Sequence, residues 1–209
     1  MDGQGSPLVL VVDDDAHMRD ALGNLFESVG LNVEVFGSTS ELLDRPSKVS
    51  SGSCLVLDIR LPGVSGLDFQ DKLARLGTNI PIIFMTGHGD VPMSVRAMKA
   101  GAIDFLTKPF RDQDMLDAVS NALILDQARR TSDGELSALV KRYESLTSRE
   151  REVIALVTRG LMNKQIGWEL GLSEITVKIH RGHLMEKMAV RTLAELVKVY
   201  EAIKPVLNK

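Results

Sequence analysis

Five short apolar runs that alternate with amphipathic segments constrain the first half of this chain more than any other feature. Apolar runs of this kind, bounded by turn residues, predict buried strands. They lie at 8–12, 32–36, 54–57, 80–85 and 102–106. Segments with helical spacing and capping residues accompany them, at 16–29, from 38, at 67–76, at 91–100 and from about 113. Because parallel strands are joined by right-handed helical crossovers, this alternation predicts an α/β fold with a doubly wound, five-stranded parallel sheet.

Proline and charge set the second half apart. Six of the seven prolines lie between Pro7 and Pro109 and the last is Pro205, so no proline interrupts a helix between them. Residues 1–125 carry 17 acidic and 10 basic side chains, whereas residues 146–209 carry 7 acidic and 11 basic ones. The second half is therefore predicted to be helical and basic, which favours a polyanionic partner.

These divisions predict three parts of the chain: an α/β domain at 1–126, a helical linker at 127–145 and an all-α domain at 146–209. In the linker, Ser132 and Glu135 have capping-box spacing around Gly134. An amphipathic stripe follows, made of Leu136, Leu139, Val140 and Tyr143. Such a stripe can pack on either domain or on a second copy, and the sequence does not choose between them.

Composition excludes several classes of protein. Apolar residues make up 44% of the chain and charged residues 25%, which excludes a disordered or collagen-like chain. No run approaches the roughly 20 apolar residues of a membrane span, and the first residues lack the pattern of a signal peptide. We therefore expect a cytoplasmic protein with no membrane partner. Cys54 is the sole cysteine, which excludes intrachain disulfides and cysteine-based zinc sites.

Acidic residues follow two of the predicted strands. Asp13, Asp14 and Asp15 end the first apolar run, and Asp58 ends the third. In the strand order 2-1-3-4-5 these two strands are neighbours, so their carboxylates converge at the carboxyl edge of the sheet. A cation makes such a cluster tolerable, and hard oxygen ligands favour Mg²⁺. Asp15 is better explained as the cap of the first helix.

The basic half has the signals of four helices. Thr147 with Glu150 forms a capping box, Asn163 and Ser173 are predicted caps, and a fourth helix begins at Thr192. A tight turn is predicted at Gly171, between the second and third of these helices. Two helices joined by a tight glycine turn form a helix-turn-helix unit, whose second helix enters the major groove of DNA. One predicted stripe of that helix is basic and sterically open; it contains Lys178, Arg181, Gly182 and Met185.

The first half resembles the receiver domain of bacterial two-component response regulators across about residues 7–126. The resemblance rests on LVLVVDDD, CLVLDIRLPGVSGLD, IIFMTGHGD and GAIDFLTKPF. It implies a flavodoxin-like sheet in the order 2-1-3-4-5, with Asp58 as phosphoryl acceptor. It also implies an Mg²⁺ site made by Asp13, Asp14, Asp58 and the backbone carbonyl of Arg60.

The same resemblance assigns three further residues of the receiver. Thr86 is the switch hydroxyl, Phe105 the switch aromatic, and Lys108 the cation that faces the phosphoryl group. The Lys108–Pro109 peptide bond is expected to be cis, a geometry accessible at modest cost only before proline. A phosphorylated receiver is expected to dimerise through its fourth helix, fifth strand and fifth helix.

The segment from 146 to about 204 resembles the four-helix DNA-binding domain of the NarL/FixJ (LuxR-type) regulators. The stretch GHGDVPMSVRAMKAGAIDFLTKPF indicates a resemblance to the FixJ branch of this family, which includes relatives such as StyR and TodT. The resemblance implies DNA contacts to bases or phosphates from Lys164, Ser173, Thr176, Lys178, Ile179, Arg181 and Gly182. Two positions depart from the usual pattern, because Gly182 replaces a longer polar residue and Gly167 replaces an alanine, which weakens its helix.

The sequence as a whole favours a DNA-binding transcriptional regulator, activated when a sensor histidine kinase phosphorylates Asp58. Its expected partners are that kinase, promoter DNA, a second copy of the chain and RNA polymerase. It is expected to be a phosphoacceptor and not an enzyme. One alternative is an Mg²⁺-dependent phosphohydrolase with Asp58 as nucleophile, disfavoured because Arg60 stands where those enzymes need an acid. The other is a regulator that binds DNA independently of phosphorylation.

Overall fold

The computed structural model describes residues 7–45, 52–87 and 91–207. The chain divides into two compact units, and the boundary in the sequence lies between Arg130 and Thr131. Residues 88–90, part of the IIFMTGHGD motif, lie outside the described residues. Each unit is described by itself. No helix in the described ranges is both long and apolar enough to cross a membrane.

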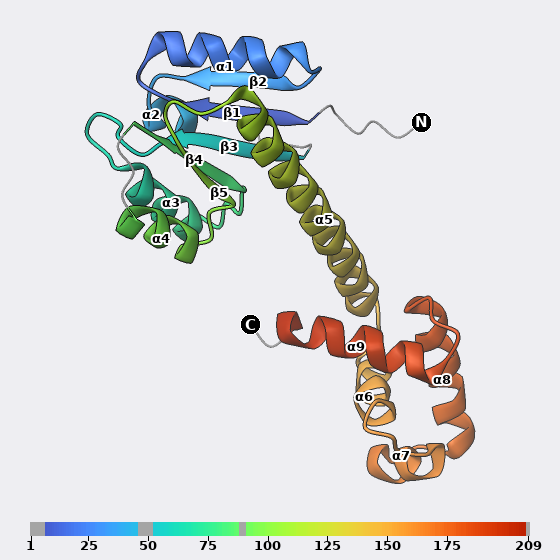
Figure 1. Ribbon diagram of the computed structural model, residues 1–209. Coiled ribbons are helices and arrows are strands. Elements are labelled where there is room, and N and C mark those ends of the chain that lie inside the picture. The colour runs from blue at the N-terminus through green and yellow to red at the C-terminus, as the bar shows by residue number, and fades with distance from the viewer. Residues whose placement is uncertain (1–6, 46–51, 88–90, 208–209) are drawn as a thin grey trace. The chain divides into compact units, whose positions relative to one another are not determined.

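The first unit contains a five-stranded parallel sheet in the order β2-β1-β3-β4-β5, which confirms the predicted topology (Figure 1). Its strands are β1 (Leu8–Val12), β2 (Asn32–Phe36), β3 (Ser53–Asp58), β4 (Ile82–Thr86) and β5 (Asp104–Thr107). Every residue of β3 and β4 is buried, as expected of central strands covered on both faces.

Alternating side chains of the central strands enter two separate cores. Val9, Val11 and Val56 pack with α1 (Ala16–Ser28) and the first turns of α5 (Asp112–Glu144). Leu10, Leu55 and Leu57 instead enter the core that contains α3 (Gly66–Arg75) and α4 (Val91–Lys99). The short α2 (Thr39–Leu43) contributes Leu42 to this second core. Both faces of the sheet are therefore covered, and its carboxyl edge is left for a site.

The second unit is helical. Its helices are α6 (Ser148–Val157), α7 (Asn163–Leu170), α8 (Glu174–Lys187) and α9 (Leu193–Leu207). They enclose one core, in which Val153, Ile154, Ile166, Val177 and Leu184 are completely buried. The amphipathic stripe at the end of α5, made of Leu136, Leu139, Val140 and Tyr143, packs against this same core.

The structure answers one question that the sequence left open, the continuity of the linker helix, and corrects one predicted cap. The capping-box spacing of Ser132 and Glu135 does not start a new helix, because α5 runs without a break from Asp112 to Glu144. A single glycine such as Gly134 costs a helix about 1 kcal/mol relative to alanine and does not by itself end it. The cap of α7 is Met162 and not Asn163, whose side-chain oxygen instead accepts a hydrogen bond from Arg181.

Candidate functional site

The acidic residues that end β1 and β3 converge at the carboxyl edge of the sheet. One carboxylate oxygen from each of Asp13, Asp14 and Asp58 lies within 4.8 Å of the others. Asp13 is completely buried and Asp58 is 7% exposed, whereas Asp14 faces solvent. Because β1 and β3 are adjacent and in register, the strand order itself produces this cluster.

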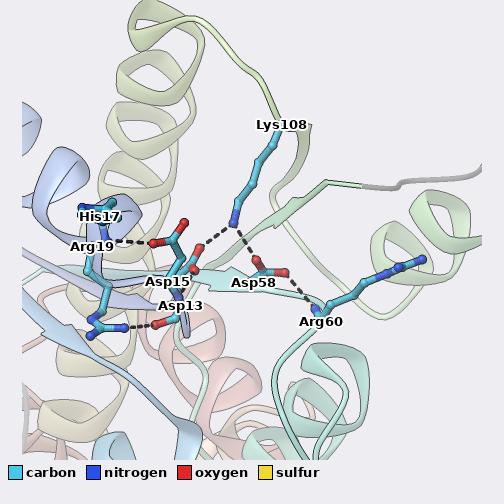
Figure 2. Close-up of polar contacts among 7 residues, drawn as sticks. All are labelled: Asp13, Asp15, His17, Arg19, Asp58, Arg60 and Lys108. Atoms are coloured by element: carbon cyan, nitrogen blue, oxygen red, sulfur yellow. Dashed lines mark hydrogen bonds and ion pairs between the residues drawn. The ribbon is translucent and has the colours of Figure 1, made fainter.

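Lys108, which follows β5, joins the two buried carboxylates. Its Nζ atom lies 2.6 Å from an oxygen of Asp13 and 2.6 Å from an oxygen of Asp58 (Figure 2). Burial acts to lower the pKa of Lys108, but its hydrogen bonds to both aspartates outweigh this effect and raise it. Burial raises the pKa of Asp13 despite the nearby ammonium group. The site therefore holds a charged lysine between two carboxylates in a poorly solvated place.

Backbone groups fix the remaining orientation of the carboxylates. The Arg60 N–H donates to Asp58 over 2.8 Å, and the Asp15 N–H donates to Asp13 over 2.9 Å. The exposed side chain of Arg60 points away from the Asp58 carboxylate (Figure 2). Asp15 accepts from the His17 N–H over 2.9 Å, which confirms that it caps α1.

Thr86, Phe105 and the Lys108–Pro109 bond lie on or directly after β4 and β5 in the first unit. Thr86 is completely buried at the end of β4, and its backbone carbonyl accepts the Lys108 N–H over 2.7 Å. Phe105 is half-buried on β5 and packs against the core that contains α3 and α4. The Lys108–Pro109 peptide bond is cis, as expected.

The donor set suits a hard divalent cation. Three carboxylates within reach of one another supply oxygen ligands, the type that Mg²⁺ prefers. Two of these carboxylates are buried, so their mutual repulsion also favours a bound cation. Asp13, Asp14 and Asp58 can therefore hold Mg²⁺, and the Arg60 backbone is held beside Asp58 by its N–H bond.

The second unit contains a helix-turn-helix made of α7, a tight turn and α8. Gly171 ends α7 in the left-handed conformation, at φ 66°, where glycine has no steric cost. The Ser173 hydroxyl then caps α8 by accepting the Thr176 N–H over 3.0 Å. Val177 and Leu184 are completely buried and attach α8 to the core, so its opposite face is free for a partner.

The residues expected at DNA differ in exposure. Lys164, Ser173, Lys178, Ile179 and Gly182 are exposed, whereas Thr176 and Arg181 are half-buried. The Arg181 guanidinium donates to Asn163 over 2.7 Å, which ties α8 to the start of α7. Met185, expected on the open stripe, is half-buried against the core.

Two comparisons with family models account for both units. Residues 9–120 match "Response regulator receiver domain", and residues 144–200 match "Bacterial regulatory proteins, luxR family". The chain belongs to the response regulators with a LuxR-type DNA-binding domain. This response regulator is thus a DNA-binding transcription regulator of a two-component system. Its receiver domain implies a histidine kinase as partner.

Individual relatives cover nearly the whole response regulator. It is 57% identical to "Nodulation protein W" of Bradyrhizobium diazoefficiens, over 94% of this chain and 86% of the relative. It is 47% identical to "Response regulator protein TodT" of Pseudomonas putida, over 96% of this chain and 88% of the relative. Among solved structures it is similar to response regulator StyR, with 49% identity and a TM-score of 0.84 over 94% of this chain and 99% of that one.

Sequence reasoning missed one residue that shapes the acidic site of this response regulator. A Cβ atom added at Gly66 would lie 2.7 Å from the backbone oxygen of Asp58 and 2.9 Å from the Cα of Ile59. Such contacts are too close, so only glycine lets the start of α3 lie against the end of β3. The available signal was the glycine directly before the predicted helix at 67–76, a position to which the sequence analysis gave no role.

Gly167 in α7 has a similar role that its helix propensity does not reveal. The expectation was that glycine here only weakens the helix. In the structure Gly167 is buried, and an added Cβ would lie 2.7 Å from the carbonyl oxygen of Leu172. The Gly167 carbonyl also accepts the Leu172 N–H over 2.8 Å. This glycine therefore allows the turn between α7 and α8 to pack closely.

Proposed function

We propose that Asp58 of this regulator accepts a phosphoryl group from a sensor histidine kinase, and that phosphorylation promotes dimerisation and promoter binding. The observation that carries the proposal is the Lys108 ammonium group, 2.6 Å from Asp58 and 2.6 Å from Asp13. Asp58 ends β3 beside two other carboxylates, and it is 7% exposed whereas Asp13 is completely buried. The carboxylate is thereby oriented and surrounded by the charges that phosphoryl transfer requires.

In the proposed transfer, a carboxylate oxygen of Asp58 bonds to phosphorus while the phosphorus–nitrogen bond of the kinase phosphohistidine breaks. The bonding electrons leave with the imidazole nitrogen, which takes a proton. Lys108 stabilises the negative charge on the phosphoryl oxygens, and the Arg60 N–H holds the attacking carboxylate. Asp13, Asp14, Asp58 and the Arg60 carbonyl would hold Mg²⁺, which would supply further positive charge. Thr86 and Phe105 are proposed to respond to the new phosphoryl group as the switch pair.

The proposed dimer uses α4, β5 and α5. Val91, Val95 and Met98 on α4 are large apolar side chains with 75%, 44% and 46% of their surface exposed. Exposed apolar groups clustered on one short helix favour a protein interface. In the second unit, Lys178, Ile179 and Gly182 are proposed to contact bases, and Lys164, Ser173, Thr176 and Arg181 the backbone. RNA polymerase is the proposed further partner at the promoter.

Phosphorylation can be tested with acetyl phosphate and Mg²⁺, followed by intact-mass measurement. We expect one added phosphoryl group on the unaltered protein and on Asp71→Asn, an exposed control on α3. We expect none on Asp58→Asn. Undiminished labelling of Asp58→Asn would contradict the acceptor assignment, and labelling that survives removal of Mg²⁺ by a chelator would contradict the metal site.

A further inference from the structure

The outward face of α8 begins with two exposed isoleucines. Ile175 and Ile179 are separated by one helical turn and have 74% and 52% of their surface exposed. Gly182 continues the same stripe at the i, i+4, i+7 spacing. This stripe lies opposite Val177 and Leu184, which are completely buried. The two isoleucines are therefore the large apolar side chains of α8 that face solvent.

The stability of the domain does not explain these isoleucines. Neither side chain belongs to the core of the second unit. A β-branched residue on an exposed helix position also has a lower helix propensity than alanine. Isolated exposed apolar residues are ordinary, but two neighbours on the free face of a helix-turn-helix favour a binding role.

The charges around the isoleucines favour DNA as their partner. Lys178 is exposed between them in sequence and borders the same face, and Lys164 is exposed on α7. Glu186 is exposed one turn beyond Gly182, so a polyanion is repelled from the carboxyl half of this face. At Gly182 an added Cβ would meet nothing within 4 Å, which leaves open space beside Ile179. The amino half of α8 thus carries both isoleucines and Lys178, with one exposed acid, Glu174, at its first residue. This is the part of a recognition helix that contacts base edges.

We propose that Ile175 is a specificity-determining residue that contacts the C5-methyl group of a thymine in the major groove, beside the contact of Ile179. Among the four unmodified bases, only thymine presents a methyl group there. One turn of helix, about 5.4 Å, separates the two side chains, whereas stacked base pairs are about 3.4 Å apart. The two contacts therefore fall on neighbouring or next-neighbouring base pairs of each half-site. This inference rests on the proposed promoter binding by α8.

The test uses the full-length protein, phosphorylated with acetyl phosphate, and duplexes selected from a random library by the unaltered protein. In the selected duplex each thymine is replaced in turn by deoxyuridine, which removes the methyl group and leaves base pairing intact. We expect at least two positions in each half-site where this replacement weakens binding by about fourfold, the effect of one lost methylene-sized contact. At one of them, Ile175→Ala should bind the thymine and deoxyuridine duplexes equally well.

Leu76→Ala is the matched control, since Leu76 is 60% exposed on the first unit and far in sequence from the recognition helix. It should keep the full methyl dependence. Because Ile175 is largely exposed and alanine has the higher helix propensity, Ile175→Ala should unfold at the same temperature as the unaltered protein or slightly above it. Ile175→Val should retain part of the methyl dependence. The proposal would be overturned if replacing thymine by deoxyuridine had no effect on binding. It would also be overturned if Ile175→Ala depended on the methyl groups as strongly as the unaltered protein does. Either result would leave promoter binding intact. A library from which no sequence is enriched would overturn promoter binding itself, and this inference with it.

Discussion

At the scale of single residues, the acidic site depends on a balance between two buried carboxylates and one ammonium group. Asp13 and Asp58 are both buried, and each lies 2.6 Å from Lys108 Nζ. Like charges in a poorly solvated place repel strongly, and the lysine ammonium group offsets this repulsion through its contacts with both carboxylates. The same ammonium group, however, repels a divalent cation bound by those carboxylates.

We therefore expect Lys108→Met to separate metal binding from phosphoryl transfer. Mg²⁺ should bind the variant more tightly, because the competing positive charge is removed. Phosphorylation by acetyl phosphate should slow by about 100-fold or more, since charge stabilisation of this kind contributes about 2.7 kcal/mol or more to a transition state. Calorimetric titration with Mg²⁺ and labelling rates at saturating Mg²⁺ measure the two effects. Parallel changes in affinity and rate would contradict this role of Lys108.

Gly66 provides a second prediction at this scale. Gly66→Ala places a methyl group against the backbone of Asp58 and Ile59, so it should lower the free energy of unfolding by about 1–3 kcal/mol. It should also slow phosphorylation of Asp58, because the end of β3 must move. Gly23→Ala is the control: it lies inside α1 with nothing within 4 Å of the added Cβ, and should stabilise the protein by about 0.5–1 kcal/mol. Urea unfolding measures both values. If Gly66→Ala left the free energy of unfolding unchanged, the packing of α3 against the end of β3 would have to accommodate a methyl group, contrary to this prediction.

At the scale of helices and strands, prediction succeeded where a pattern repeats locally. The five apolar runs predicted the five strands, and the capping pairs at Ser38 and Thr147 begin helices as expected. Prediction from the sequence was incomplete where packing between distant segments decides the structure. The sequence left open whether the linker helix is continuous at Gly134; α5 continues through it, and residues such as Leu139 and Val140 pack on the core of the second unit. The roles of Gly66 and Gly167 also depend on close approach between segments, which no helix propensity encodes.

The first turn of α6 contains a buried carboxylate with a predictable pH dependence. Glu150 is 3% exposed; it accepts the Thr147 N–H over 2.8 Å and contacts Lys187 Nζ at 2.7 Å. Burial acts to raise the pKa of Glu150, but these hydrogen bonds outweigh it and lower the pKa below the ordinary value of 4.5. The ionised form is thus favoured in the folded state. Its contribution to stability is fully present above about pH 4.5 and is lost as the pH falls through the folded-state pKa.

Glu150→Gln should consequently lower the free energy of unfolding at pH 7 by about 1.5–3 kcal/mol, the range for hydrogen bonds to a charged group. The difference from the unaltered protein should shrink as the pH falls below 4.5. Glu152→Gln is the control, because Glu152 pairs with Arg149 at the surface and such pairs contribute little. Urea titrations of residues 131–209 at several pH values, followed by circular dichroism, measure these effects. A pH-independent difference would assign the cost of Glu150→Gln to packing alone.

At the scale of the whole molecule, the acidic and basic halves of the sequence correspond to two units that contain different sites. The acidic first unit contains the carboxylate cluster, and the basic second unit contains the helix-turn-helix. Strand order brought Asp13 and Asp58 together as the sequence predicted, because in-register parallel strands end at one edge. The exposure of Ile175 was not predicted, because it depends on which face of α8 the core covers. The two units are separately compact, so each can be tested by itself.

The remaining question at this scale is whether the unphosphorylated receiver restrains DNA binding. The stripe at the end of α5 packs on the core of the second unit, so the fragment for this test should begin at residue 131 and not at 146. If the receiver restrains the helix-turn-helix, residues 131–209 should bind a selected duplex about 5- to 150-fold more tightly than the unphosphorylated full chain, the usual range of coupling between sites. Phosphorylation should recover that affinity in the full chain but not in Asp58→Asn. Titrations at matched salt concentration are essential, because phosphate contacts make DNA affinity depend steeply on salt. Equal or weaker binding by the fragment would mean that dimerisation alone carries the signal, and equal binding by all forms would favour a regulator that binds DNA independently of phosphorylation.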